Sequence, residues 1–123
     1  EPRPWNDTLL QLKELAEQVS SSRFNSVLLN YYRDGRDSMG LHADDEPELG
    51  PEPVIASLSL GATRTLYFRH RLRKELATVN VPLPSASLLV MRGQTQRNWK
   101  HGIRKVSRPC GPRINLTFRN IVR

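Results

Sequence analysis

Residues 53–71, PVIASLSLGATRTLYFRHR, carry the clearest signal of the fold in this sequence. Within it, residues 54–60 and residues 63–69 are two short runs rich in β-branched, aromatic and other apolar side chains, and Gly61 lies between them. Short runs of this composition, bounded by turn residues, are typical of β-strands. The stretch therefore predicts two successive strands in the middle of the chain.

The same signals continue on both sides of this pair. Strands are predicted at four further places, residues 24–33, 76–81, 87–91 and 113–121. Residues 43–53 contain several acids and three prolines, and they predict a loop.

One amphipathic helix is predicted before the strands, over residues 5–20. Its apolar side chains recur at spacings of three and four, at Trp5, Leu9, Leu12, Ala16 and Val19. Asn6 or Asp7 can cap its start. One helix followed by many short strands predicts a mainly β (α+β) chain. The fold class we expect is a double-stranded β-helix, or jelly roll, with the N-terminal helix packed outside.

Length and composition favour one intracellular domain with an anionic partner. The chain has 123 residues, one cysteine and a net charge of +7, and it shows neither a signal peptide nor an apolar run that could span a membrane. Residues 1–63 carry a net charge of −6 and residues 64–123 a net charge of +13. A basic half of this kind favours nucleic acid as partner, although a solvated surface that keeps a small protein soluble would look the same. We expect a cytoplasmic or nuclear monomer.

Two of the three histidines are candidate metal ligands. His42 and Asp44 are two residues apart, so in an extended segment both side chains point to the same side. His101, from a distant part of the chain, would complete the two-histidine, one-carboxylate set of non-haem Fe(II) oxygenases. His70 lies between two arginines and is interpreted as a surface residue. An H-x-D triplet also arises by chance, and an acidic loop would equally account for Asp44.

The last predicted strand carries a second candidate site. Residues 113–119, RINLTFR, alternate polar and apolar side chains, so that one face of the strand presents Arg113, Asn115, Thr117 and Arg119. If this face lies inside a barrel, its arginines need anionic partners, and a small dicarboxylate would supply them. Asn30 and Tyr32 could add an amide and a hydroxyl. The alternative is an ordinary sheet with its polar face in water.

These motifs together resemble the AlkB family of Fe(II)- and 2-oxoglutarate-dependent dioxygenases, which repair alkylated nucleic acid. The resemblance lies in N-x-Y at residues 30–32, HADDE at 42–46, His101, RINLTFR at 113–119, and the strand pair of residues 53–71. It covers nearly everything from Phe24 onward. It implies that the chain oxidatively dealkylates N1-methyladenine and N3-methylcytosine in DNA or RNA. The same resemblance implies that Fe(II) is the metal cofactor and that 2-oxoglutarate and O₂ are consumed, with succinate and formaldehyde as products.

The resemblance also implies a role for each motif residue. The catalytic iron would be ligated by His42, Asp44 and His101. The 2-oxoglutarate site would consist of Asn30, Tyr32, Arg113, Asn115, Thr117 and Arg119, with Arg113 on the far carboxylate. The substrate base would stack on His42 and face Glu46, while Asp45 would hold Arg119.

The chain also departs from the family pattern, because only four residues precede Trp5. Family members have an upstream nucleotide-recognition lid there, so we expect residues 1–123 to be a catalytic domain that lacks it. A missing lid keeps two alternatives open. One is an oxygenase acting on a modified RNA, a protein or a small molecule, and the other is a non-catalytic nucleic-acid-binding barrel. Trp99 could border the metal site or simply pack in the core.

Overall fold

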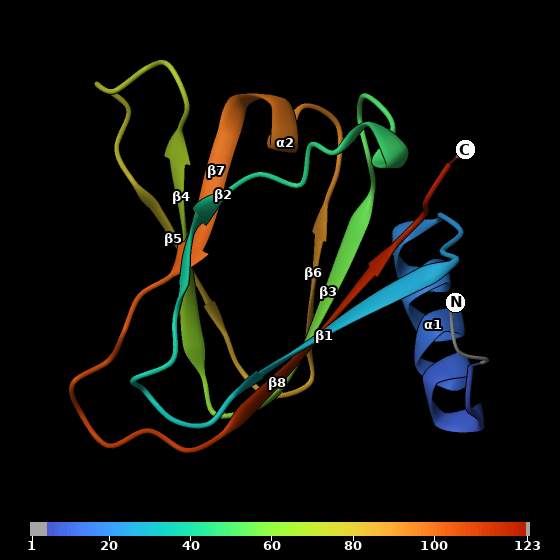
Figure 1. The fold of residues 1–123 in the computed structure, drawn as a ribbon, viewed down its shortest axis with the longest axis horizontal. Coiled ribbons are helices and arrows are strands. Elements are labelled where there is room, and N and C mark those ends of the chain that lie inside the picture. The colour runs from blue at the N-terminus through green and yellow to red at the C-terminus, as the bar shows by residue number, and fades with distance from the viewer. Residues whose placement is uncertain (1–4, 123) are drawn as a thin grey trace.

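Two four-stranded antiparallel sheets face each other in the computed structural model, which describes residues 5–122 (Figure 1). The first sheet has the order β1 (Ser26–Tyr32), β8 (Arg113–Arg119), β3 (Ile55–Gly61) and β6 (Ser87–Met91). The second has the order β2 (Met39–His42), β7 (Trp99–Ile103), β4 (Arg64–His70) and β5 (Val79–Leu83). The chain changes sheet at every step except from β4 to β5. The predicted jelly roll is therefore confirmed.

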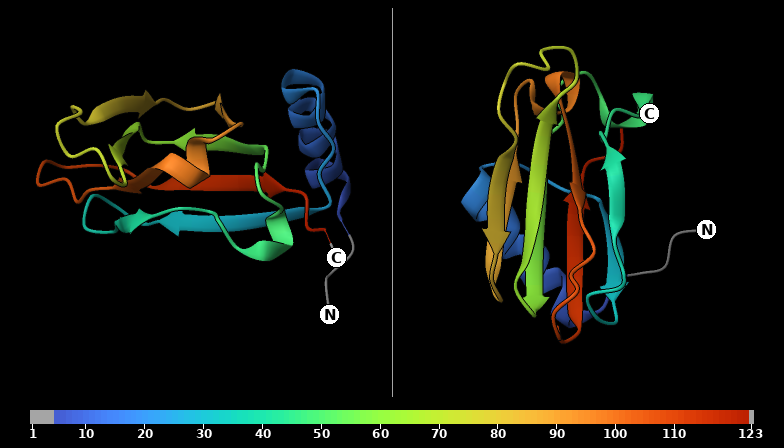
Figure 2. Two further views of the ribbon diagram at one scale, coloured as in Figure 1. Left: turned by 90° about the horizontal axis from the view of Figure 1, so that it is seen from above. Right: turned by 90° about the vertical axis from the view of Figure 1, so that its left-hand side faces the viewer.

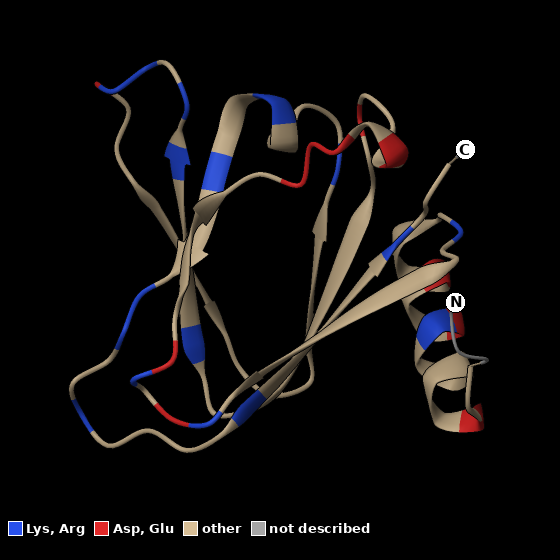
Figure 3. Cartoon of the chain, viewed as in Figure 1, with Lys and Arg blue, Asp and Glu red and all other residues tan. Residues whose placement is uncertain are grey.

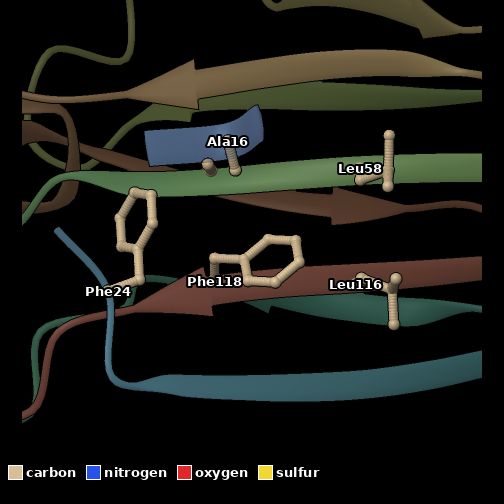
Figure 4. Packing of buried hydrophobic residues seen from close by; sticks show 6 residues of the cluster. Ala16, Phe24, Leu58, Leu116 and Phe118 are labelled. Carbon is tan, nitrogen blue, oxygen red and sulfur yellow. The ribbon is translucent and has the colours of Figure 1, made fainter. Parts of the chain in front are cut away.

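Helix α1 (Asp7–Ser20) packs against the outer face of the first sheet, across the strands (Figures 1 and 2). The Asn6 side chain accepts a hydrogen bond from the Leu9 amide at 2.8 Å, so Asn6 is the N-cap. Ala16 meets Phe24 of the following loop and Phe118 of β8 in a core cluster that α1 shares with the sheet (Figure 4). The single outer helix is thus confirmed.

One residue of the predicted helix stripe does not pack. Val19 is 60% exposed, whereas Ser20 is completely buried. Ser20 can take the inner position because its hydroxyl donates to the Ala16 carbonyl at 2.7 Å, which satisfies the polar group that burial removes from water.

Strands β2 and β7 and the short helix α2 (Thr95–Asn98) were not predicted as regular structure. Both strands are short and contain a glycine, which weakens a strand signal. Yet a Cβ at Gly102 would lie 2.8 Å from the Met39 carbonyl oxygen, so the glycine is what lets β7 approach β2. Gly102 therefore weakens the strand signal of β7 in the sequence, although the pairing of β7 with β2 requires it.

Strands β3 and β4 are each shifted by one residue from the expected ranges, and β1, β5 and β8 differ by more. Strand β1 covers Ser26–Tyr32 rather than residues 24–33. Strand β5 runs through Pro82, which it tolerates because it is an edge strand paired only with β4. Strand β8 ends at Arg119, beyond which the Asn25 side chain pairs with both backbone groups of Ile121 in place of a strand ladder.

Candidate functional site

Two histidines and one carboxylate converge where β2 and β7 pair. His42 ends β2 and lies directly opposite His101 of β7, while Asp44 follows two residues later. Nε2 of His42 is 3.9 Å from Oδ1 of Asp44, and Nε2 of His101 is 3.6 Å from its Oδ2. One ligand atom from each residue lies within 4.8 Å of the others, and no other such group occurs within residues 5–122. The structure thus brings together the three predicted ligands, in a donor set that suits Fe(II).

The orientation of the two imidazoles favours metal binding. Nδ1 of His42 is 2.9 Å from the Gly40 carbonyl oxygen. Because a carbonyl only accepts, Nδ1 carries the proton and Nε2 keeps its lone pair toward Asp44. The His101 ring is almost fully buried and lies against Phe68, with 5.7 Å between ring centroids.

Burial sets the charge of this group. Desolvation, reinforced by His42, lowers the pKa of His101 to about 4, so its ring is neutral at pH 7. Burial raises the pKa of the Asp44 carboxyl, while the charges of His42 and Arg119 oppose that rise. A neutral imidazole is the form that binds a metal, and a partly buried carboxylate gains a counter-charge when the ion arrives.

Gln96 of α2 supports the carboxylate ligand, and no sequence pattern pointed to this residue. Its side chain is 2% exposed, and its Oε1 accepts a hydrogen bond from the Asp44 backbone amide at 2.7 Å. The Gln96 carbonyl in turn accepts from Arg71 Nη1 at 3.1 Å. Gln96 therefore fixes the backbone of Asp44 from a helix that is distant in sequence.

A buried guanidinium lies at the other end of the cavity. Arg113 is 1% exposed, and its Cζ is 4.9 Å from the centre of the Tyr32 ring. Its Nη2 donates to the Ser59 hydroxyl at 2.9 Å, but Nε and Nη1 are buried without a hydrogen-bond partner. Burial lowers the pKa of Arg113, and the Tyr32 phenol partly restores it. A buried guanidinium with N–H groups left unpaired needs an anionic partner, so these residues fit the far carboxylate of 2-oxoglutarate.

Serines of β3 line the wall beside this guanidinium. Asn115 donates to the Ser57 hydroxyl at 2.6 Å and to the Leu58 carbonyl at 3.2 Å, and it accepts from Thr117 at 2.8 Å. Ser57 and Ser59 were not predicted as site residues. The signal was present, because they alternate with Ala56, Leu58 and Leu60 and so share the inner face of β3.

The predicted ligands and cosubstrate residues all border one cavity between the two sheets. They are Asn30, Tyr32, His42, Asp44, His101, Arg113, Asn115, Thr117 and Arg119. The polar face of β8 therefore points inward, toward the ligand group, and not into water.

Two residues predicted to face the substrate base lie outside this cavity. Asp45 and Glu46 are exposed, on the loop that leads to the 3-10 helix η1 (Pro47–Leu49). The prediction that Asp45 holds Arg119 is wrong, because Oδ2 of Asp45 is 3.2 Å from Nη1 of Arg71. Arg119 instead acts electrostatically on Asp44. Arg71 can reach Asp45 because Gln96 already holds its guanidinium beside the loop.

The remaining aromatic candidates are structural. His70 is half-buried rather than a surface residue, since its Nδ1 accepts from the Leu72 and Arg73 amides at 3.2 and 2.9 Å. The Trp99 ring packs edge-on against His70, with 5.0 Å between ring centroids. Trp99 therefore packs and does not border the metal group.

Comparison with known proteins defines the class of this fold and site. Residues 1–119 match the family described as the 2OG-Fe(II) oxygenase superfamily. The chain belongs to this superfamily. Within residues 5–122, no helix has both the length and the apolar character needed to cross a membrane.

Curated relatives place the chain among the AlkB-type dioxygenases of that superfamily. It is 46% identical to the alpha-ketoglutarate-dependent dioxygenase alkB homolog 3 of Mus musculus, over 98% of this chain and 45% of the relative. It is 40% identical to the DNA oxidative demethylase ALKBH2 of Homo sapiens, over 98% of this chain and 49% of the relative. The chain thus spans about half the length of these relatives, and the AlkB resemblance predicted from the sequence is confirmed.

A solved structure supports the fold independently. The structure of OsALKBH1 matches 93% of this chain and 60% of its own, with a TM-score of 0.61 and 22% sequence identity.

Proposed function

We propose that this chain oxidatively dealkylates N-alkylated bases, N1-methyladenine and N3-methylcytosine, in DNA or RNA. The reaction would consume 2-oxoglutarate and O₂ and release succinate, CO₂ and formaldehyde. The observation that carries the proposal is the cavity in which His42, Asp44 and His101 lie at one end and the unpaired Arg113 at the other. Two of its relatives are named as a dioxygenase and a DNA demethylase of the AlkB type.

The residues divide the work of binding. His42, Asp44 and His101 would hold Fe(II), and the Arg113 guanidinium would bind the far carboxylate of 2-oxoglutarate. Bound iron and 2-oxoglutarate supply the oxidising chemistry, and the protein supplies orientation and electrostatics. Asn30, Thr117 and Arg119 would border the keto-acid end of the cosubstrate, because they line the same cavity as the ligand group.

The acidic loop suits a cationic base. N1-methyladenine and N3-methylcytosine carry a positive charge, and Asp45 and Glu46 are exposed next to the ligand Asp44. His42 is 36% exposed at its side chain, so a base flipped out of its stack could lie against its ring. One group of acidic residues lies on the loop after β2, and others lie on α1 and the β1–β2 connection (Figure 3). Basic residues predominate along the β4–β5 and β7–β8 connections. Those basic segments would hold phosphates, and a nucleic-acid substrate would place the reaction inside the cell.

The test is mass spectrometry of a single-stranded oligonucleotide that carries one N1-methyladenine. It is incubated in air with the protein, Fe(II), 2-oxoglutarate and ascorbate. The His101→Ala variant tests the ligand, and His70→Asn is the control for loss of a histidine outside the cavity. We expect loss of the methyl mass with wild type and His70→Asn only.

Two outcomes would overturn the proposal in different ways. An unchanged oligonucleotide with succinate formed would indicate an oxygenase of another substrate, such as a modified RNA, a protein or a small molecule. An unchanged oligonucleotide without succinate would indicate a barrel that binds but does not react.

A further inference from the structure

Arg64, at the start of β4, is a buried cation that has no role in the reaction proposed above. It is 2% exposed, and within residues 5–122 no carboxylate lies within 4.0 Å of it. Its guanidinium donates to three backbone carbonyls, those of Asp34 at 3.2 Å, Asp37 at 2.9 Å and Arg104 at 2.7 Å. A buried charge without a counter-charge is costly, so its presence calls for an explanation beyond packing.

Arg64 lies against the same tyrosine ring as Arg113. Its Cζ is 5.6 Å from the centre of the Tyr32 ring, and the Cζ of Arg113 is 4.9 Å from that centre. Tyr32 is 4% exposed and is the register partner of Arg113 between β1 and β8. Arg64 comes from the opposite sheet and does not border the cavity itself. Both guanidiniums therefore lie beside Tyr32, and the Arg64 charge is close to the end of the cavity that holds Arg113 without lining it.

We propose that Arg64 is a positioning and charge-selecting residue that tunes the Tyr32–Arg113 end of the cavity for a doubly negative cosubstrate. Its contacts with three carbonyls fix the guanidinium against Tyr32, and Tyr32 in turn supports Arg113. Its charge, which has no carboxylate within 4.0 Å among residues 5–122, attracts the second carboxylate of the ligand. The inference rests on the proposed function only through 2-oxoglutarate, and not through the nucleic-acid substrate.

The Arg64 charge also acts on Arg113. Burial and the Arg64 charge both lower the pKa of Arg113. The repulsion between two buried cations beside one ring is reduced when an anion binds near them. A far carboxylate would thus gain from both charges while contacting only Arg113.

A purely structural role is the alternative that the experiment must separate. Arg64 also ties the β1–β2 loop to the β7–β8 loop, because its carbonyl partners come from both. The same loops are joined independently where the Val106 amide donates to the Gly35 carbonyl at 2.7 Å. A Cβ at Gly35 would lie 2.5 Å from the Val106 carbonyl oxygen. Gly35→Ala therefore disturbs this loop contact without removing a charge, and it is the matched control.

The experiment measures the binding of two keto acids by calorimetry, with the Mn²⁺-loaded protein and no nucleic acid. One is 2-oxoglutarate, and the other is 2-oxopentanoate, which has the same chain length without the far carboxylate. The readout is the ratio of their dissociation constants in wild type, Arg64→Met, Arg64→Lys and Gly35→Ala. Thermal unfolding confirms that each variant is folded.

We expect Arg64→Met to weaken 2-oxoglutarate binding roughly tenfold and 2-oxopentanoate binding less than about threefold, because only the former carries the second charge. Arg64→Lys should retain most of the wild-type ratio, and Gly35→Ala should leave the ratio unchanged. Should Arg64→Met fail to fold, Arg64→Gln, which keeps N–H donors but not the charge, replaces it under the same criterion.

Equal weakening of both acids in the uncharged variant would overturn the proposal, since that is the result of a structural tie. Loss of the ratio in Arg64→Lys would overturn it as well. A protein that binds 2-oxoglutarate with this selectivity but leaves methylated oligonucleotides unchanged would refute the substrate proposal and keep this one.

Discussion

Replacing Gln96 by methionine should weaken metal binding while the three ligands stay in place. The substitution keeps a similar side-chain volume, and it replaces the amide by an apolar thioether at a residue that is 2% exposed. It removes the acceptor, 2.7 Å away, of the Asp44 backbone amide. Oε1 of Gln96 is the only hydrogen-bond acceptor found for this amide in the described chain, so the loop carrying Asp44 loses its anchor.

The size of the effect follows from that one bond. Leaving a part-buried amide without an acceptor costs about 1–3 kcal/mol. Part of this free energy appears as weaker metal binding, because the Asp44 ligand is held less firmly. Mutation of supporting residues of this kind commonly changes metal affinity by roughly 10- to 100-fold. We therefore expect a Kd for Mn²⁺ or Co²⁺ that rises by at least about tenfold, measured by titration without 2-oxoglutarate.

Gln94→Met is the control for this prediction, because Gln94 is exposed before the same short helix and its side chain accepts a hydrogen bond from Asn98 rather than from the Asp44 loop. It should leave the metal affinity unchanged. An unchanged metal Kd in a folded Gln96→Met protein would refute the reasoning that the Asp44 backbone is held by Gln96.

Three further predictions follow from the same geometry. Without metal, stability should fall between pH 6.5 and about 4 by roughly 3 kcal/mol, because unfolded His101 takes a proton that the buried ring refuses. The raised pKa of Asp44 offsets part of this, and denaturant unfolding of wild type and His101→Gln across that pH range would show a flatter dependence in the variant. Arg113→Met should weaken 2-oxoglutarate binding roughly 100-fold or more, measured by calorimetry. It should not lower the melting temperature, measured by thermal unfolding, since it removes a buried cation that has no counter-charge within the described chain. Gly102→Ala should destabilise the protein by about 1–3 kcal/mol and weaken metal binding, because its Cβ would press on the Met39 carbonyl, whereas Gly111→Ala, with open space around it, should do neither.

The inner face of β8 shows what the sequence could predict. Arg113, Asn115, Thr117 and Arg119 share one face by simple alternation, and that face does line the cavity. Period two is a property of the extended chain itself, so it needs no tertiary information once the strand is recognised.

The support of the ligand group could not be predicted in this way. Gln96 contacts Asp44 across 52 positions of sequence. Arg71 pairs with Asp45 because the Gln96 carbonyl already holds the Arg71 guanidinium nearby. Such contacts depend on how the chain crosses between sheets, and no local pattern encodes them. Strand β7 was missed because Gly102, which lets β2 approach, also weakens the local strand signal.

The weak pairing of strand β2 implies that the metal-free protein loses its metal-binding geometry before it unfolds. It is four residues long, irregular in register, and paired on one side only, with β7. Short edge segments open by local fluctuations far below the free energy of global unfolding. Because His42 ends this strand, each such opening separates one ligand from the other two while both sheets stay folded. Amide exchange in residues 39–42 should therefore be fast in the metal-free protein. It should become slow once the ion links β2 to β7, because the bound ion then suppresses the local opening of this edge strand.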